Sequence, residues 1–303
     1  MRIFIIKLLI FVSPLILFIG WWEVNLARMP NRYKTNVHLL SESMADCEVL
    51  ILGSSHPKCA IDPSCLKQKA VNMAEGWQAL YADAEIVAYY LPRLPKLKIV
   101  VLSVSYHSLE ELALEYTNVP YRRIAYHKYY HLPTKTWADN FDVRNFSMIA
   151  WYGVPVCLGY LRKGFTEEPF KSQPKEVAFN DESGKLRVDE FHGQMDPTNI
   201  APNRVTLLQT IVLCQKAKVI PVLVTVPVYR TFRAHMDRAK YERMQDVIHG
   251  LCDETGVRYF NYLDDARFDI DDFGNIDHLN WRGAEKFSRI LDSEVLQKIQ
   301  TAK

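Results

Sequence analysis

Four short apolar runs, separated by stretches with helical periodicity, constrain this fold more than any other feature of the sequence. Each run has the length of a strand, and one of them is a continuous apolar run of the kind found in parallel sheets covered on both faces. Strands that alternate with amphipathic helices indicate a three-layer α/β sandwich with a mostly parallel sheet. The expected strands are 47–53, 96–105, 218–226 and 256–261, and the expected helices are 77–91, 204–216, 241–255 and 283–299.

The N-terminal segment differs from these runs because it is long enough to cross a membrane. Residues 3–22 are almost entirely apolar, and a helix of this length, rising 1.5 Å per residue, spans the roughly 30 Å hydrocarbon core of a bilayer. Trp21 and Trp22 fall where an aromatic belt lies. No small-residue cleavage pattern follows, so we expect an uncleaved transmembrane signal anchor over residues 1–24.

The basic residues on the two sides of this segment point to opposite orientations. Arg28, Arg32 and Lys34 outnumber Arg2 and Lys7, and basic residues favour the cytoplasmic side. A single N-terminal span with a short basic head, however, usually sends the long C-terminal part of the chain across the membrane. We therefore expect the body on the extracytoplasmic side, periplasmic or extracellular.

The remaining chain is predicted to form one body behind a short linker. Residues 25–46 are polar and typical of a linker that leads into a first helical turn or two. Residues 47–303 contain all of the expected strands. Within that body, residues 109–199 are rich in Tyr, His, Lys and Pro and have weak periodicity. We interpret this region as an insertion or cap of irregular helices and loops rather than as a second domain.

The charge balance and the spacing of metal-binding residue types exclude two classes of function. The 37 Lys and Arg residues against 35 Asp and Glu residues give a net charge of +2, whereas nucleic-acid binding needs a clustered excess of positive charge. Carboxylates and histidines do not recur at the spacings typical of metal ligands. We therefore expect no nucleic acid, no metal and no cofactor.

The segment Gly53-Ser54-Ser55-His56 directly follows the first expected strand. In open parallel sheets, functional residues gather where the carboxyl ends of strands meet loops. A glycine permits a sharp turn there, and N–H groups at a helix start favour developing negative charge, so a serine at this place is a candidate nucleophile. A serine at a strand-to-helix junction is equally a common N-cap.

A second candidate segment, Asp277–Ala284 (DHLNWRGA), precedes the last expected helix. A histidine beside an acidic residue and close to a helix N-terminus is a candidate general base. This makes His278 the most suggestive of the nine histidines. The alternative is a loop histidine that caps the helix or faces solvent.

Together, a serine after the first strand and a histidine before the last helix resemble the chain order of the SGNH/GDSL hydrolase superfamily. Ser54 is similar to the Asp, and Ser55 to the nucleophile, of the Gly-Asp-Ser block; His278 is similar to the His of the C-terminal Asp-x-x-His block. The Gly-Ser-Ser form and the DHLNxxGA run resemble a membrane-anchored branch. That branch includes the teichoic-acid D-alanyl transfer protein and proteins that O-acylate cell-surface polysaccharides.

The resemblance implies a serine acyl-transfer site. Ser55 would attack an ester carbonyl, and His278 would take its proton and return it to the leaving or accepting group. The Ser55 N–H and Gly76 would form an oxyanion hole, and Ser105 stands where the family has an Asn donor. Ser54, which stands where the family has the Asp of its Gly-Asp-Ser block, would belong to the same oxyanion or substrate-binding pocket.

Asn275 and Asp277 are the two candidates for the residue that orients His278, and His56 follows the candidate nucleophile in the sequence. The family has an Asp three residues before the His, and here that position is Asn275. An Asn Oδ1 accepts the imidazole N–H but does not stabilise the imidazolium by charge. Asp277, adjacent to the histidine, is the second candidate. His56 either lines the pocket or has a capping or structural role.

What the resemblance implies is a membrane-anchored serine esterase or O-acyltransferase that acts on a cell-envelope glycan or glycolipid. The partners would be an acylated glycan or glycolipid substrate and the membrane. The departures at Asn275 and Ser105 favour an alternative: a catalytically inactive partner with the same fold that binds a glycan or a membrane-bound O-acyltransferase.

Overall fold

The computed structural model describes residues 1–29, 31–111, 120–133, 137–163 and 178–301. The chain divides into two compact units, and each is described by itself. The first, which we call the helical unit, consists of Met1–Thr35 and Tyr121–Phe170. The second, the sheet unit, consists of Asn36–Pro120 and Lys171–Lys303.

The sheet unit contains five strands that all pair in parallel, in the order β2-β1-β3-β4-β5. This confirms the predicted α/β class with a parallel sheet. The four predicted strands are present, and a short strand at the edge, β2, was not predicted because three residues give no readable pattern. The strands are β1 (Val49–Leu52), β2 (Ala70–Asn72), β3 (Ile99–Ser103), β4 (Ile220–Thr225) and β5 (Arg258–Asn261).

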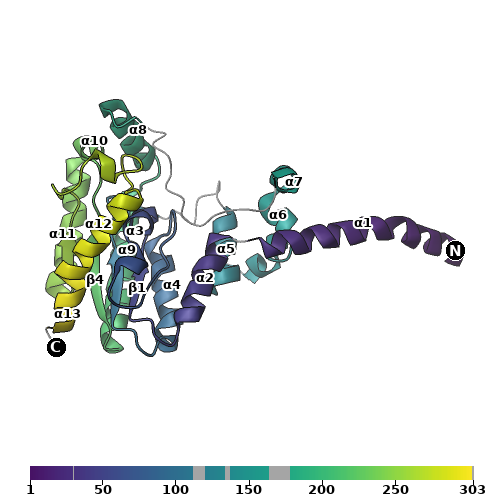
Figure 1. The fold of residues 1–303 in the computed structure, drawn as a ribbon, viewed down its shortest axis with the longest axis horizontal. Helices are drawn as coiled ribbons and strands as arrows, with labels where there is room; N and C mark the ends of the chain where they lie inside the picture. Colours follow the sequence, from purple (N-terminus) through teal and green to yellow (C-terminus); the bar gives the residue numbers. More distant parts are fainter. Residues whose placement is uncertain (30, 112–119, 134–136, 164–177, 302–303) are drawn as a thin grey trace. The chain divides into compact units, whose positions relative to one another are not determined.

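Helices cover both faces of this sheet, as Figure 1 shows. Successive strand residues point to opposite faces. On one face, Ile51 and Val101 pack in a core cluster with Phe287 of helix α12. On the other, α9 packs against β4 and against α4, and α11 packs against β5. All residues of strands β1 and β3 are buried, which matches their largely apolar sequences.

The helices of the sheet unit agree with the predicted periodic segments and add several short ones. The predicted closing helix begins earlier, at Trp281, because the Asn280 side chain accepts hydrogen bonds from two N–H groups of the first turn. The bounds are α3 (Ser55–Ala60), α4 (Leu80–Tyr90), α8 (Asp181–His192), α9 (Ile200–Lys216), α10 (Arg230–His235), α11 (Arg238–Thr255), α12 (Trp281–Leu291), a π-helical turn (Asp292–Leu296) and α13 (Gln297–Thr301).

The helical unit is built around one long apolar helix. That helix, α1, is the one helix among the described residues that is long and apolar enough to cross a membrane. Trp22 and Leu26, near its C-terminal end, pack with Met148 and Cys157. The helices are α1 (Arg2–Arg28), α5 (Pro120–Tyr130), α6 (Met148–Tyr152) and α7 (Val154–Lys163), with 3₁₀ turns at Trp137–Phe141 and Val143–Asn145.

Two predicted boundaries differ from the structure. Residues 25–46, expected as a linker, are mostly helical: α1 continues to Arg28, and α2 covers Arg32–Ser43. The fully buried Leu26 and Leu40 explain this, because tertiary packing stabilises helices that polar composition alone does not suggest.

The predicted insertion, 109–199, does not form one cap. Its central part, Tyr121–Phe170, belongs to the helical unit, and its two ends, 109–120 and 171–199, belong to the sheet unit. The stretches 112–119, 134–136 and 164–177 lie outside the described residues.

Candidate active site

The turn after β1 requires a glycine. Gly53 has a φ of 129°, and a Cβ there would lie 2.8 Å from Pro57 Cγ and 3.0 Å from the Ser103 carbonyl oxygen. This tight turn places Ser55 as the first residue of α3. Ser54 occupies the N-cap position, but its side chain makes no capping hydrogen bond, so the capping role considered for the serines is not the one the structure shows for Ser54.

The structure brings Ser55 and His278 together across 223 positions of the sequence. Ser55 Oγ lies 2.7 Å from His278 Nε2, which is hydrogen-bond distance and the spacing of a nucleophile and its base. Both side chains are only partly buried, so the pair is open to a reactant. The geometry permits proton transfer from the hydroxyl to the imidazole.

The loop that carries His278 is held in place by its own backbone. Gly274 N–H donates to the His278 carbonyl at 2.9 Å, and Phe273 and Leu279 form an antiparallel bridge. Where α12 begins, a Cβ on Gly283 would lie 2.1 Å from the Asp272 carbonyl oxygen, so only glycine fits. These contacts fix the position of the imidazole.

Asn275 is the residue that orients His278 by hydrogen bonding. Its Oδ1 lies 3.0 Å from His278 Nδ1 and also accepts from the backbone N–H groups of His278, at 2.8 Å, and Asp277, at 3.1 Å. With Nδ1 bound to this acceptor, Nε2 is the nitrogen free to accept a proton from Ser55. The contact is the one expected for Asn275 from the sequence.

Asp277 lies on the same side of the imidazole and supplies the charge that an Asn lacks. Its Oδ1 is 3.1 Å from His278 Nδ1 without forming a hydrogen bond, and the side chain is 1% exposed. Burial alone would raise the pKa of Asp277, but the charges of His278 and Arg187 and the hydrogen bonds with His56 and Arg187 hold it well below its usual value. The carboxylate is therefore ionised at neutral pH and places a negative charge beside the imidazole ring.

Arg187 is a residue of the site that the sequence did not reveal. Its Nε donates to Asp277 Oδ2 at 2.9 Å, its Nη1 to Glu190 at 2.6 Å, and its guanidinium lies over the Phe191 ring. It comes from α8, in the part of the predicted insertion that gave no periodic signal. A lone Arg in such a region carries no pattern that would have found it.

Two further histidines pack behind the Ser55–His278 pair. The His56 ring lies 5.2 Å from His278 and 5.1 Å from His107, and His107 stacks on Phe191 at 4.5 Å. Both rings are 2% exposed. Burial lowers the pKa of His56 and, more strongly, that of His107, so both are neutral at pH 7. His56 Nε2 lies 3.4 Å from Asp277 Oδ2, which places His56 behind the reacting pair rather than beside the nucleophile.

The predicted oxyanion donors are only partly available. The Gly76 N–H donates to Glu75 Oε1 at 2.6 Å, and Glu75 is buried and paired with Lys58. This hydrogen bond occupies the N–H group that Gly76 would need as an oxyanion donor. In contrast, the hydroxyls of Ser54 and Ser105 are buried and have no hydrogen-bond partner among the described residues.

His56, Asp277 and His278 lie close enough to hold a metal ion, with one donor atom from each within 4.8 Å of the others. The chemistry of the donors argues against it. Arg187 already places a cation 2.9 Å from Asp277 Oδ2, and a metal there would meet that charge. In addition, His278 Nε2 faces Ser55 Oγ. The residues present fit a serine–histidine pair better than a metal centre.

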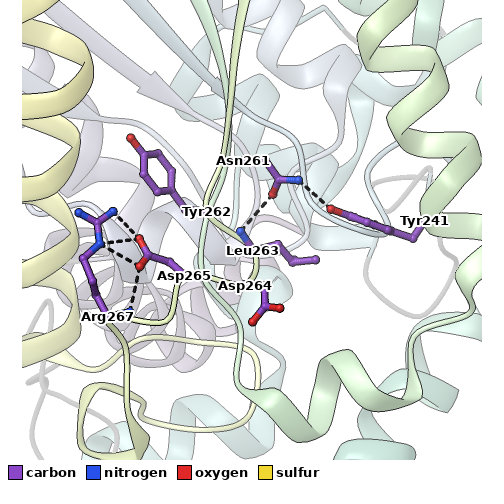
Figure 2. A pocket seen from close by; sticks show the side chains of 7 residues that line it. All are labelled: Tyr241, Asn261, Tyr262, Leu263, Asp264, Asp265 and Arg267. Atoms are coloured by element: carbon purple, nitrogen blue, oxygen red, sulfur yellow. Dashed lines mark hydrogen bonds and ion pairs between the residues drawn. The ribbon is translucent and has the colours of Figure 1, made fainter.

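A separate cavity of about 350 Å³ lies at the end of β5 and contains none of the predicted site residues (Figure 2). Its polar side chains bond mainly to one another: Asn261 Nδ2 donates to Tyr241 OH at 2.7 Å, and Arg267 binds Asp265. Because these groups already have partners, the cavity presents few free polar atoms to a ligand. Its lining is Tyr241, Asn261, Tyr262, Leu263, Asp264, Asp265 and Arg267.

Comparison with known proteins gives only a distant likeness of structure. Neither a family model nor a curated protein matches the sequence. A proposed acylhydrolase from Bacteroides fragilis is 10% identical with a TM-score of 0.43, covering 89% of this chain and 95% of its own. A GDSL-like lipase from Bacteroides thetaiotaomicron is 11% identical with a TM-score of 0.42, covering 90% of this chain and 100% of its own.

A third solved structure, described as a proposed platelet activating factor from Streptococcus pneumonia, is 10% identical with a TM-score of 0.42 and covers 94% of this chain and 98% of its own.

Proposed function

We propose that this protein is a membrane-anchored serine esterase or O-acyltransferase that acts on a cell-envelope glycan or glycolipid. The observation that carries the proposal is the 2.7 Å contact between Ser55 Oγ and His278 Nε2. It joins the two segments that the sequence singled out, at the carboxyl end of the sheet where α/β proteins place their sites.

In this proposal, Ser55 Oγ attacks an ester carbonyl while His278 Nε2 takes its proton. The resulting imidazolium is oriented by Asn275 and stabilised by the Asp277 carboxylate. His278 then returns the proton to the leaving oxygen, and an acyl-enzyme remains on Ser55. Water or a sugar hydroxyl, deprotonated by the same imidazole, takes the acyl group and releases Ser55. Hydrolysis and transfer differ only in that last acceptor.

The membrane part of the proposal rests on α1. Its residues face outward along most of the helix, for example Phe11 at 82% and Leu17 at 72% exposure. An outward-facing apolar helix of this length is typical of a transmembrane segment. A tether of this kind keeps the enzyme near envelope glycans and membrane acyl donors, and we place the body on the extracytoplasmic side.

A second candidate function is a non-catalytic partner that binds a glycan or a membrane-bound O-acyltransferase. The observation that favours it is the bond between Gly76 N–H and Glu75, because it removes a predicted oxyanion donor. Loss of one such donor typically raises a barrier by about 2.7–4 kcal/mol. The unpaired hydroxyls of Ser54 and Ser105 are the groups that would have to replace it.

The two functions are separated by ester turnover. The full-length protein in detergent is mixed with p-nitrophenyl acetate, and wild type is compared with Ser55→Ala and with Ser293→Ala, a control serine on the exposed surface. We expect turnover in wild type and Ser293→Ala and its loss in Ser55→Ala. Equal rates in all three proteins, or none in a folded wild type, would favour the binding role.

A further inference from the structure

Several apolar side chains of the helical unit are exposed in a part of the chain that nothing above assigns to the site. Trp137 is 77% exposed, Phe141 64% and Phe146 74%, all within one short segment of 3₁₀ turns. On α7, Val154 and Leu158 are 52% and 44% exposed and, four residues apart, lie on the same helix face. Large apolar side chains clustered on a surface mark a contact with a partner or a membrane.

The position of these residues follows from how α1 is joined to α6. Glu23 comes directly after the apolar stretch of α1, and its carboxylate accepts from the N–H groups of Met148 at 2.7 Å and Ile149 at 3.3 Å, and from the Ser147 hydroxyl. Trp22 and neighbouring apolar residues of α1 pack in the same cluster as Met148. The segments that carry the exposed side chains are therefore fixed to the end of α1, and Figure 1 shows α6 and α7 beside that end.

The length of α1 sets the depth at which that joint lies. The 27 residues of Arg2–Arg28 extend about 40 Å at 1.5 Å per residue, which exceeds the roughly 30 Å hydrocarbon core. If residues 3–22 fill the core, Glu23 and the helix α6 that it binds lie at headgroup level. Aromatic side chains such as Trp137 and Phe146 are favoured at that level.

The two units also differ in net charge, and the difference favours a membrane contact by the helical unit. The ranges of the helical unit contain 12 Lys and Arg residues against 5 Asp and Glu residues, whereas those of the sheet unit contain 25 against 30. Juxtamembrane basic residues are attracted to anionic lipid headgroups. An excess of positive charge therefore lies in the ranges that also expose apolar side chains.

We propose that the segment 137–158 of the helical unit lies in the membrane interface beside α1, with its exposed aromatic and aliphatic side chains inserted among lipid headgroups and upper acyl chains. The occupant of this surface is an anionic lipid bilayer. The inference rests on the membrane anchoring proposed above and adds a second, interfacial contact. This contact would limit how far the helical unit can tilt away from the membrane surface.

The test uses the full-length protein in vesicles of mixed zwitterionic and anionic phospholipid. The photocrosslinking amino acid p-benzoylphenylalanine replaces one of three exposed residues: Phe146 in the proposed surface, Phe11 in α1, or Val205 on α9 of the sheet unit, which is 47% exposed. After illumination, lipid adducts are counted by intact-mass spectrometry. We expect adducts at Phe146 and Phe11, with a yield at Phe146 about tenfold above that at Val205.

Each of the other outcomes would overturn either the interfacial surface alone or the surface together with the membrane anchor. Adducts at Phe11 with only background yield at Phe146 would overturn the interfacial surface and leave the anchor intact. Background yield at both positions would overturn the anchor and the surface together. A product of twice the protein mass at Phe146, without lipid, would show that a second copy of the chain covers this face instead. Replacing Phe146 by Ser in an otherwise unlabelled protein checks that this exposed residue is not needed for folding.

Discussion

The sheet unit buries Asp277, His56 and His107 almost completely, while the helical unit leaves Trp137 and Phe146 mostly exposed. A buried charge requires a partner, and Asp277 has one in Arg187. Exposed aromatic rings that gather in one segment mark a candidate contact surface. In the two proposals made above, chemistry and membrane contact are carried by separate parts of the chain, so variants in one unit should leave the function of the other unchanged.

The largest expected effect comes from removing the base. His278→Ala leaves Ser55 without a proton acceptor and should lower the turnover of p-nitrophenyl acetate by about 10⁴-fold or more. His249→Ala, an exposed histidine on α11, is the matched control and should keep the wild-type rate. Phe146→Ser in the helical unit should also keep the rate in detergent. A large loss in Phe146→Ser would show that the units are not independent.

Asn275→Ala should have the next largest effect on turnover. It removes the oxygen that accepts from His278 Nδ1 and from two backbone N–H groups, so the imidazole loses its orientation and the loop loses its turn. We expect a decrease of about 10²–10³-fold in kcat, in the range of losing a preorganised polar contact. Asn275→Asp keeps the acceptor and should retain much more activity than Ala. Equal loss in both variants would argue against an orienting role.

We expect Asp83 to give the sheet unit a pH-dependent stability. It is buried below the Gly53 turn, and burial raises its pKa to about 7 although hydrogen bonds from Gln78 and the Gly53 N–H oppose this. A folded-state pKa above the unfolded value means that the folded state binds more protons, so stability falls as pH rises between the two values. From pH 5 to pH 8 the expected loss is about 3 kcal/mol.

Asp83→Asn should abolish most of this decrease, because the amide does not ionise. Chemical denaturation of both proteins at pH 5 and pH 8, followed by circular dichroism, measures it. If both proteins lose the same stability between these values, Asp83 is not the group responsible.

Arg187→Gln removes the cation from the Asp277 carboxylate and leaves a buried charge without its ion pair. Because Arg187 is itself about one quarter exposed, we expect a destabilisation of about 2 kcal/mol, less than for a fully buried pair. The pKa of Asp277 should rise, so that the stability contributed by its ionised form is lost at a higher pH on acidification. Arg238→Gln breaks the exposed pair with Glu242 and should change stability little. Chemical denaturation measures both effects. Similar denaturation midpoints for Arg187→Gln and Arg238→Gln would contradict the role of Arg187.

The smallest expected effect is local to the helical unit. Glu23→Gln keeps one acceptor oxygen at the start of α6 but removes the charge, which should weaken the joint by about 1 kcal/mol. Hydrogen exchange measured by mass spectrometry should become faster in α6 and remain unchanged in β3. Faster exchange in β3 would show that the two units are coupled.

Patterns of apolar residues predicted the sheet well because periodicity and burial coincide there. The strand β3 is continuous in its apolar sequence and is fully buried in the structure. Short or contact-dependent elements were beyond such patterns. The three residues of β2 are too few to show a pattern, and α2 is stabilised by the burial of Leu40 rather than by its own composition.

The pairing of Ser55 with His278 could be predicted from chain order, because loops at one edge of a parallel sheet meet in space. Asn275 follows from the resemblance, because it stands where the family has an Asp three residues before the histidine. Arg187 was not predicted, since its role depends on how α8 packs, with a glycine at position 184 whose Cβ would lie 2.4 Å from the Thr231 carbonyl oxygen. The hydrogen bond from the Gly76 N–H to the Glu75 carboxylate could not be predicted either, because the sequence does not show which way the Glu75 side chain points.

Whether Ser55 is an activated nucleophile can be measured by its reaction with a fluorophosphonate probe. The full-length protein is labelled in detergent, digested, and the modified peptide is identified by mass spectrometry in wild type, Ser55→Ala and His278→Ala. We predict a single adduct on Ser55, absent in Ser55→Ala and strongly reduced in His278→Ala. A folded wild type that does not react, or labelling that persists unchanged in Ser55→Ala, would contradict a serine acyl-transfer site.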